Sequence, residues 1–287
     1  MYKCFKMRKF IILSVCDMIM IVTALIVTLM GTAYNEKEEK VFLPIIMYHS
    51  IVGDDDQGGD YQVRVSVVEQ DLAYLKKNGY TAVFVEDVVN YVKNNKSLPE
   101  KPVIITADDG FYNNYYYLLP LLEKYDMKAT ISVVGYYSEV IAAKDPHIPQ
   151  YSYLTWEDIS KLLESGRVEI GNHTYNMHSL SERCGCEKLS FESEGEYVKK
   201  LNEDIGLMQT LIKMNTGVSP TVFAYPFGII SKESIPVLKE LGFTAALNCI
   251  EKPNYISHDE SCLFTLNRYN RPDGISTEEF MSRHLKN

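Results

Sequence analysis

Residues 103–110 read Val-Ile-Ile-Thr-Ala-Asp-Asp-Gly, and the rest of the sequence is best interpreted outward from this stretch. The β-branched run after Pro102 is typical of a strand that is buried on both faces of a sheet. The strand ends in Asp108 and Asp109, whose side chains point to opposite faces as long as the strand stays regular. Gly110 allows the backbone to turn at once, so both acids can lie at the edge of the sheet. Two like charges held this close require a metal ion, a cation or a shared proton.

The structural alternative for this stretch is a loop in which an aspartate caps a helix over residues 113–123. A second motif argues against it, because residues 173–178 read His-Thr-Tyr-Asn-Met-His. On a continuous helix a gap of five residues rotates by about 140°, whereas at a strand end that enters a turn both histidines can converge. Asp109, His173 and His178 would then form a metal-binding set with positions open for water and substrate, as in catalytic sites. Capping or surface histidines are the alternative.

Predicted strands and helices alternate along the chain about eight times, which indicates parallel strands joined by crossover helices. The expected fold is α/β, a distorted (β/α) barrel of about seven or eight strands. In such barrels the chemistry lies where the strands end, and Asp108, Asp109, His173, Phe227 and His49 all fall there. The strands are expected at residues 43–48, 81–85, 103–107, 129–134, 167–171, 221–224, 244–247 and 263–268. The helices are expected at residues 66–78, 86–94, 113–123, 155–165, 193–214, 231–241 and 277–285.

The first 34 residues differ from the remainder. Four basic residues precede an apolar run at 10–33 that only Asp17 interrupts. A run of about 24 residues can span a bilayer and exceeds the core of a usual signal peptide. The basic flank predicts a single-pass anchor with the main body outside the cell membrane, and a cleaved signal with a secreted body is the alternative. The predicted division is an anchor at 1–34, a charged tether at 35–40 and one domain at 41–287.

The net charge limits the kinds of partner, and the cysteines limit the possible disulfide bonds. The formal net charge is −9, and the basic N-terminal segment leaves the body at −12. An acidic body argues against binding nucleic acid through phosphates. Four cysteines lie in the body, and Cys249 could form a disulfide with Cys262 across a hairpin-like connection. Four free thiols, including Cys184 and Cys186, is the alternative.

Three motifs, ITADDG at 105–110, HTYNMH at 173–178 and FAYPFG at 223–228, together resemble the polysaccharide deacetylases of carbohydrate esterase family 4. The opening PIIMYHSI at 44–51 is similar to the permuted subgroup that contains poly-N-acetylglucosamine deacetylases. The resemblance covers about residues 41–285 and implies a distorted (β/α) barrel. It implies one divalent metal ion, zinc first and cobalt or nickel as alternatives, and an N-acetylated glycan as the substrate.

The resemblance also implies roles for individual residues. Asp108 matches the general base, and His49 matches the general acid of the permuted subgroup. The metal ligands would be Asp109, His173 and His178. The backbone N–H of Phe227 would help to hold the oxyanion. Tyr225 and Pro226 of the same motif are the predicted substrate-binding residues.

Two positions depart from the family pattern. Ala107 stands where many members have an aromatic residue. Ala224 stands where many have an arginine that pairs with the base. We therefore expect a higher pKa for Asp108 than in those relatives unless another cation, with Arg268 and Arg271 as candidates, replaces that arginine. Neither change removes a reacting group.

The sequence thus predicts a membrane-tethered metal-dependent hydrolase that removes N-acetyl groups from N-acetylhexosamine units of an extracellular, cell-wall or biofilm polysaccharide. Two alternatives stay open. One is an inactive barrel that only binds glycan, and the other is an O-acetylesterase on the same fold. The motifs do not specify the glycan, its linkage or the oligomeric state.

Overall fold

The structure of the protein is a computed structural model that describes residues 11, 15, 17–27, 40–144 and 146–285. Two compact units, Met1–Lys40 and Val41–Asn287, divide the chain. The second unit contains all strands of the described residues. Within the described residues, no helix combines the length and the apolar character needed to cross a membrane. Eleven of the 24 residues of the predicted span at 10–33, and five of the six residues of the tether at 35–40, lie outside the described residues.

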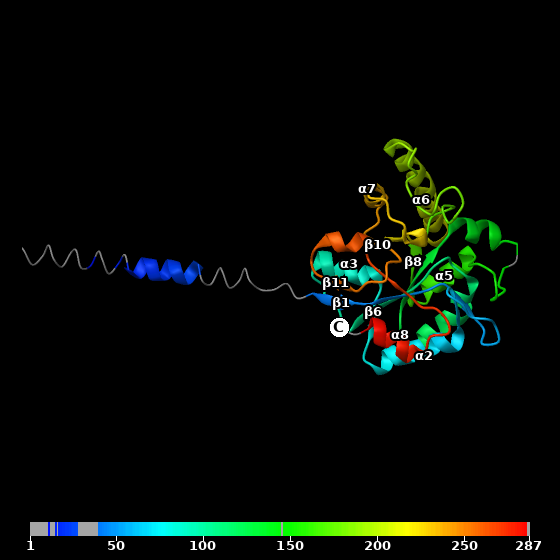
Figure 1. The fold of residues 1–287 in the computed structure, drawn as a ribbon, viewed down its shortest axis with the longest axis horizontal. Coiled ribbons are helices and arrows are strands. Elements are labelled where there is room, and N and C mark those ends of the chain that lie inside the picture. Colours follow the sequence, from blue (N-terminus) through cyan, green and yellow to red (C-terminus); the bar gives the residue numbers. More distant parts are fainter. Residues whose placement is uncertain (1–10, 12–14, 16, 28–39, 145, 286–287) are drawn as a thin grey trace, which may run out of the picture. The chain divides into compact units, whose positions relative to one another are not determined.

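The second unit is built on a parallel sheet whose spatial order is β10-β9-β8-β7-β6-β2-β12, with the short β5 also paired to β6. One further parallel bridge pairs Leu247 of β10 with Leu266, which lies three residues before β12. The coarse prediction of a distorted (β/α) barrel therefore agrees with the structure (Figure 1). The strands are β1 Val41–Leu43, β2 Ile45–Tyr48, β3 Ser50–Val52, β4 Gln62–Arg64, β5 Thr81–Ala82, β6 Pro102–Ala107, β7 Ala129–Val133, β8 Val168–Asn172, β9 Val222–Ala224, β10 Ala245–Leu247, β11 Asn254–Ile256 and β12 Tyr269–Asn270.

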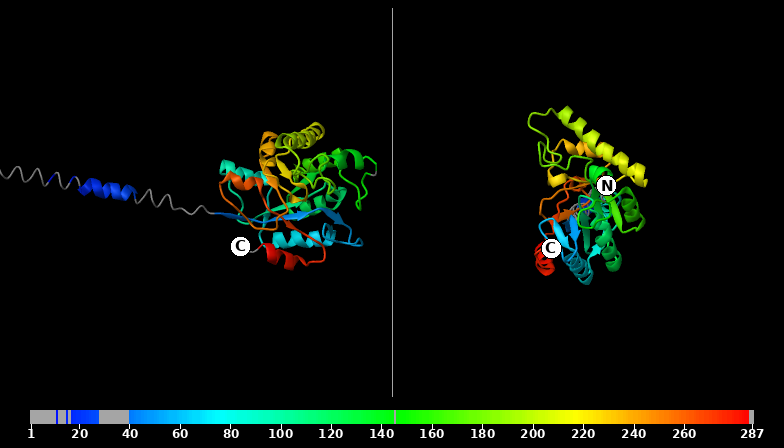
Figure 2. Two further views of the ribbon diagram at one scale, coloured as in Figure 1. Left: turned by 45° about the horizontal axis from the view of Figure 1, so that its top comes forward. Right: turned by 90° about the vertical axis from the view of Figure 1, so that its right-hand side faces the viewer.

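Helices cover the outside of the sheet, and neighbouring helices pack on one another. Helix α8 lies beside α2, α2 contacts α4, and α6 lies between α5 and α7 (Figures 1 and 2). The α-helices of the second unit are α2 Val65–Lys77, α3 Val85–Asn94, α4 Leu119–Tyr125, α5 Trp156–Glu164, α6 Glu194–Thr216, α7 Ser234–Glu240 and α8 Thr277–His284. Shorter turns are the π-helical η1 Asn114–Leu118 and η2 Tyr137–Ile141 and the 3-10 turns η3 Pro226–Gly228 and η4 Glu260–Phe264.

Strand β6 shows why the β-branched run is continuous rather than alternating. Every residue of β6 is buried. Val103, Ile105 and Ala107 belong to one hydrophobic cluster and Ile104 belongs to the other, so both faces of the strand are covered. A strand covered on both faces needs apolar residues at every position. Thr106 and Asp108 share the face of Ile104, because side chains alternate along a strand.

The last predicted strand, at 263–268, is wrong. Leu263 and Phe264 lie in the 3-10 turn η4, which Asp259 caps by accepting a hydrogen bond from the Ser261 N–H. A short apolar run fits a strand and a helical turn equally well, so periodicity could not separate them. The expected helix at 113–123 is also divided, into η1 and α4. The antiparallel pairing of β1 with β11 had no signal in the sequence.

Candidate active site

The register of the sheet brings the predicted residues to one edge. Tyr48 of β2 pairs with Ala107 of β6, so His49 and Asp108, which follow them, lie at neighbouring strand ends. His173 follows β8 and donates its N–H to the Val133 carbonyl of β7 at 3.0 Å. These residues line a cavity of about 540 Å³. Its walls consist of Met47, His49, Tyr61, Asp108, Asp109, His173, His178, Leu180, Phe227, Cys249, Glu251 and Asn270.

The turn after β6 starts one residue earlier than its glycine suggests. Asp109 has a φ of 71° and Gly110 a φ of 72°, so both lie in the left-handed region. Aspartate tolerates this region better than most residues, whereas a side chain at Gly110 would also approach Val133 Cγ1 to 2.9 Å. The turn swings the Asp109 carboxylate away from that of Asp108. The two acids therefore serve different partners.

Asp108 is paired with Arg268, which comes just before β12. The Arg268 Nη1 donates to Asp108 Oδ1 at 2.8 Å and Nη2 donates to Oδ2 at 2.7 Å, and Arg268 is fully buried. Burial by itself raises the pKa of Asp108, but Arg268, with His173 and His49, more than offsets it and the pKa is lowered. Another cation therefore replaces the missing arginine, and the condition for a raised pKa of Asp108 is not met. Of the two candidate cations, the structure selects Arg268.

Arg271 belongs to a different buried network. Its Nε donates to Asp71 Oδ2 at 2.7 Å and its Nη2 donates to Asp71 Oδ1 at 3.1 Å. Asp71 also accepts hydrogen bonds from Tyr48 and Thr277. The network joins β2, α2 and α8 behind the strand ends. It does not contact Asp108.

The second acid, Asp109, lies between the two histidines. Its Oδ1 is 3.0 Å from His178 Nε2 and 3.5 Å from His173 Nε2. The candidate ligand atoms of all three residues lie within 4.8 Å of one another. The structure thus brings the predicted metal ligands together from two strand ends and one loop.

Local hydrogen bonds orient each histidine. His173 Nδ1 is 2.8 Å from the Ala224 carbonyl, which can only accept, so Nδ1 carries a proton and Nε2 is the ring nitrogen that faces Asp109. His178 Nδ1 lies 3.5 Å from the Tyr137 hydroxyl, and its ring packs 4.7 Å from the Phe227 ring. Asp204 of α6 accepts hydrogen bonds from two backbone N–H groups in the loop between the histidines, those of Tyr175 and Asn176. Sequence reasoning missed Tyr137 and Asp204, which have no motif of their own.

The donor set fits a divalent metal ion. Asp109 Oδ1 is buried and, within the described residues, receives no hydrogen bond with acceptable geometry. A buried acceptor without a donor is costly, and a cation would satisfy it. One carboxylate and two neutral imidazoles with room for further ligands suit zinc and similar divalent ions. Asp109, His173 and His178 are therefore the residues that would hold the ion.

His49 lines the same cavity as Asp109, His173 and His178. Its Nδ1 is buried and makes no hydrogen bond among the described residues, while its ring packs edge-on against Tyr61 at 4.9 Å. Burial lowers the pKa of His49, and the nearby Asp108 and Asp109 only partly offset this effect. His49 is consequently neutral in the resting site at neutral pH.

Only part of the third motif, at residues 223–228, lines the cavity. Phe227 lines the cavity, with an unusual φ of 58°. Tyr225, by contrast, is fully buried and shares a hydrogen bond of 2.7 Å with Ser234 Oγ. Pro226 is also buried and does not line the cavity. The structure does not bring the side chains of Tyr225 and Pro226 to a position for contact with substrate, because the turn directs them into the core.

All four cysteines of the second unit are free thiols. Of the two alternatives left open by the sequence, the structure shows the free thiols and no bridge between Cys249 and Cys262. Cys249 instead lies against Arg268 Nη2 at 3.6 Å and Met47 Sδ at 3.8 Å in the cavity wall.

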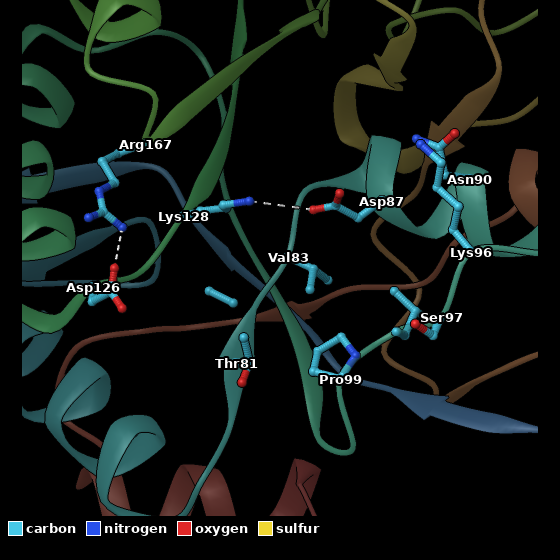
Figure 3. A pocket seen from close by; sticks show the side chains of 12 residues that line it. Thr81, Val83, Asp87, Asn90, Lys96, Ser97, Pro99, Asp126, Lys128 and Arg167 are labelled. Atoms are coloured by element: carbon cyan, nitrogen blue, oxygen red, sulfur yellow. Dashed lines mark hydrogen bonds and ion pairs between the residues drawn. The ribbon is translucent and has the colours of Figure 1, made fainter.

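A separate cavity of about 370 Å³ lies at the opposite ends of the strands. Its walls include residues that begin β5 or precede β7 and β8. Figure 3 shows that its Arg167 and Lys128 side chains are already paired with Asp126 and Asp87. This cavity offers no cluster of metal ligands or nucleophiles. The chemistry of the protein is therefore assigned to the other end of the sheet.

A barrel of parallel strands whose ends carry an Asp-His-His cluster and an arginine-paired aspartate defines a hydrolase-type site on a (β/α) fold. The chain belongs to the polysaccharide deacetylase family, since the family model described as polysaccharide deacetylase matches residues 95–246.

Individual relatives agree with this assignment. The chain is 26% identical over 220 residues to the poly-beta-1,6-N-acetyl-D-glucosamine N-deacetylase of Escherichia coli K12, a match that covers 69% of this chain and 32% of that protein. It is 26% identical to the Staphylococcus aureus MRSA252 protein of the same name, covering 67% of this chain and 63% of that protein. The match therefore spans only about a third of the first relative.

The fold has solved counterparts. The structure of the Streptococcus pyogenes deacetylase PplD in complex with acetate matches with a TM-score of 0.70 at 21% identity. The match covers 86% of this chain and 100% of that one. At this identity the likeness supports the fold.

Proposed function

We propose that this protein is a metal-dependent hydrolase that removes N-acetyl groups from N-acetylhexosamine units of an extracellular or cell-wall polysaccharide. The observation that carries the proposal is that one cavity contains two aspartates with different partners. Asp109 faces His173 and His178, and Asp108 is held ionised by Arg268. Poly-N-acetylglucosamine is the favoured substrate class, because relatives that match most of the body carry that activity in their names.

The roles of the residues follow from their partners. A divalent ion, when bound by Asp109, His173 and His178, would supply acidification of water and polarisation of the acetyl carbonyl. Asp108 accepts the proton of the attacking water, and its lowered pKa keeps it available for this at neutral pH. The Phe227 N–H contributes to holding the negative charge on the former carbonyl oxygen, an effect worth about 3 kcal/mol for a single donor.

His49 has the remaining task, which is to protonate the departing amine. An amine leaves poorly unless it is protonated. The proton that Asp108 takes from the attacking water is the one that the amine requires, and His49 passes it on. The lowered pKa of His49 makes its protonated form a stronger acid, which gives this proton up to the amine. The products are acetate and a glycan unit with a free amine.

The location of the domain is part of the proposal. The basic residues before the apolar run at 10–33 support an N-terminus in the cytoplasm and a body that faces the outside of the cell. A glycan outside the membrane would then be within reach.

Acetate release tests the proposed function. The full chain is incubated with N-acetylglucosamine oligomers of different linkage, with an O-acetylated glycan and with a phosphorylated substrate. We expect acetate from an N-acetylated oligomer and its loss in Asp108→Asn. Retention of glycan binding without any acetate release in the unaltered protein would favour a binding module, and acetate only from the O-acetylated glycan would favour an esterase.

A further inference from the structure

Part of the cavity wall is not used by the chemistry described above. It consists of Glu251, in the connection between β10 and β11, and Asn270, which ends β12. The two are linked, because Glu251 Oε1 accepts a hydrogen bond from the Asn270 N–H at 3.2 Å. We refer to Glu251 and Asn270 as the acceptor pair.

Among the described residues, the Glu251 carboxylate has no ion-pair partner and the Asn270 Oδ1 has no hydrogen-bond donor. Glu251 is exposed, and no basic side chain of the described residues lies within 4 Å of its carboxylate. The other cavity acids differ, since Asp108 has Arg268 and Asp109 has the histidines. Asn270 donates from Nδ2 to the Asp60 carbonyl at 2.9 Å, which fixes its amide. Its Oδ1 is then left buried without a donor among the described residues.

A carboxylate without an ion-pair partner, beside an amide oxygen without a donor, calls for a ligand that donates hydrogen bonds and carries positive charge. A primary ammonium group has three donors and one charge, so it satisfies both requirements. A sugar hydroxyl supplies one donor without charge. The reaction under "Proposed function" itself generates primary ammonium groups along the glycan.

The cavity that the acceptor pair lines also adjoins a second hollow, whose walls do not include the pair. This hollow of about 320 Å³ shares His49, Tyr61 and Asp109 with the main cavity. A unit next to the reacting one therefore has space while the reacting acetyl group stays at the Asp-His-His cluster.

We propose that the acceptor pair binds the ammonium group of a glucosamine unit that has already been deacetylated, so that the enzyme prefers N-acetylated units with a deacetylated neighbour. This inference rests on the proposed function. It makes the enzyme selective for partly deacetylated stretches of glycan.

The test compares two tetramers of N-acetylglucosamine, one fully acetylated and one with a single glucosamine unit, at low and at 0.5 M salt. The kcat/KM for acetate release should be about 3- to 10-fold higher for the tetramer with glucosamine, the range expected for one partly exposed charge-assisted contact. The preference should disappear in Glu251→Gln and shrink in high salt. Glu240→Gln is the matched control, because Glu240 is also exposed and lies on α7, outside the cavity. It should keep the preference.

Three results would overturn the proposal: equal kcat/KM for the two tetramers, an equal loss on both tetramers in Glu251→Gln, or loss of the preference in Glu240→Gln. The equal loss would mean that Glu251 binds a hydroxyl.

A binding measurement keeps the inference separate from the proposed function. Calorimetry measures the affinity of glucosamine tetramer for Asp108→Asn and for the double variant that also carries Glu251→Gln. A 3- to 10-fold weaker affinity in the double variant supports the acceptor pair even where no substrate is turned over, and an unchanged affinity refutes it. Absence of acetate release from every tetramer would refute the proposed function alone.

Discussion

Replacement of Arg268 by methionine removes the cation that keeps Asp108 ionised, while it keeps much of the side-chain volume. The pair is buried, with Arg268 fully inaccessible and Asp108 2% exposed. Two hydrogen bonds of 2.8 and 2.7 Å are lost together. Removing one partner of a buried ion pair costs about 3–5 kcal/mol, because the other charge stays buried without compensation.

The Arg268→Met change also reverses the way in which stability depends on pH through Asp108. In the unaltered protein the pKa of Asp108 is lowered, so its contribution to stability is present above the usual carboxyl value of about 4 and is lost as the pH falls through the folded-state value. In Arg268→Met, burial dominates and the pKa rises. The variant should then lose stability as the pH rises above about 4, and the acid limb of its kcat/KM profile should move to higher pH.

Urea unfolding and the pH profile of acetate release measure both effects, and Arg271→Met is the matched control. Arg271 is also fully buried and bidentate to an acid, Asp71, but it does not touch Asp108. We expect a similar loss of stability and no shift of the acid limb. Combining Arg268→Met with Asp108→Asn should restore part of the stability. An acid limb that stays in place in Arg268→Met would refute the role assigned to Arg268.

Three further changes test the supports of the site. Tyr137→Phe removes the hydroxyl beside His178 Nδ1 and should weaken zinc affinity about 10-fold, measured by competition with a chelating dye, with little change in stability. Asp204→Ala frees two backbone N–H groups of the loop before His178 and should lower both zinc affinity and loop protection in hydrogen exchange, whereas unaltered protection would contradict its anchoring role. Gly110→Ala places a methyl group 2.9 Å from Val133 Cγ1 at positive φ and should cost about 1–3 kcal/mol in urea unfolding.

The sequence predicted the parts of the fold that have local signals. The apolar run of β6 identified a strand covered on both faces, and the acids after it marked the functional edge. His173 was placed correctly at a strand end and His178 on the turn that follows it, because a five-residue gap is incompatible with one helix face. Turn-forming residues and the spacing of apolar residues indicate these features from a few neighbouring positions.

Other parts of the site depend on contacts between distant residues. Arg268 is 160 residues from Asp108, and nothing in its neighbourhood distinguishes it from Arg271. Tyr225 lies in a motif that lines the cavity at Phe227, yet its own side chain is buried because the backbone turns between them. The acceptor pair likewise forms only when the connection after β10 meets the end of β12. Such contacts follow from the order of the strands in the sheet and have no local pattern.

The central claim is that Asp109, His173 and His178 hold one divalent ion that the hydrolysis of the N-acetyl group requires. Its most direct test is acetate release from an N-acetylglucosamine oligomer by chelator-treated protein titrated with zinc. We predict no release after chelation and full recovery at about one equivalent of zinc, with no recovery in Asp109→Ala. Undiminished acetate release by the chelated protein would contradict the account.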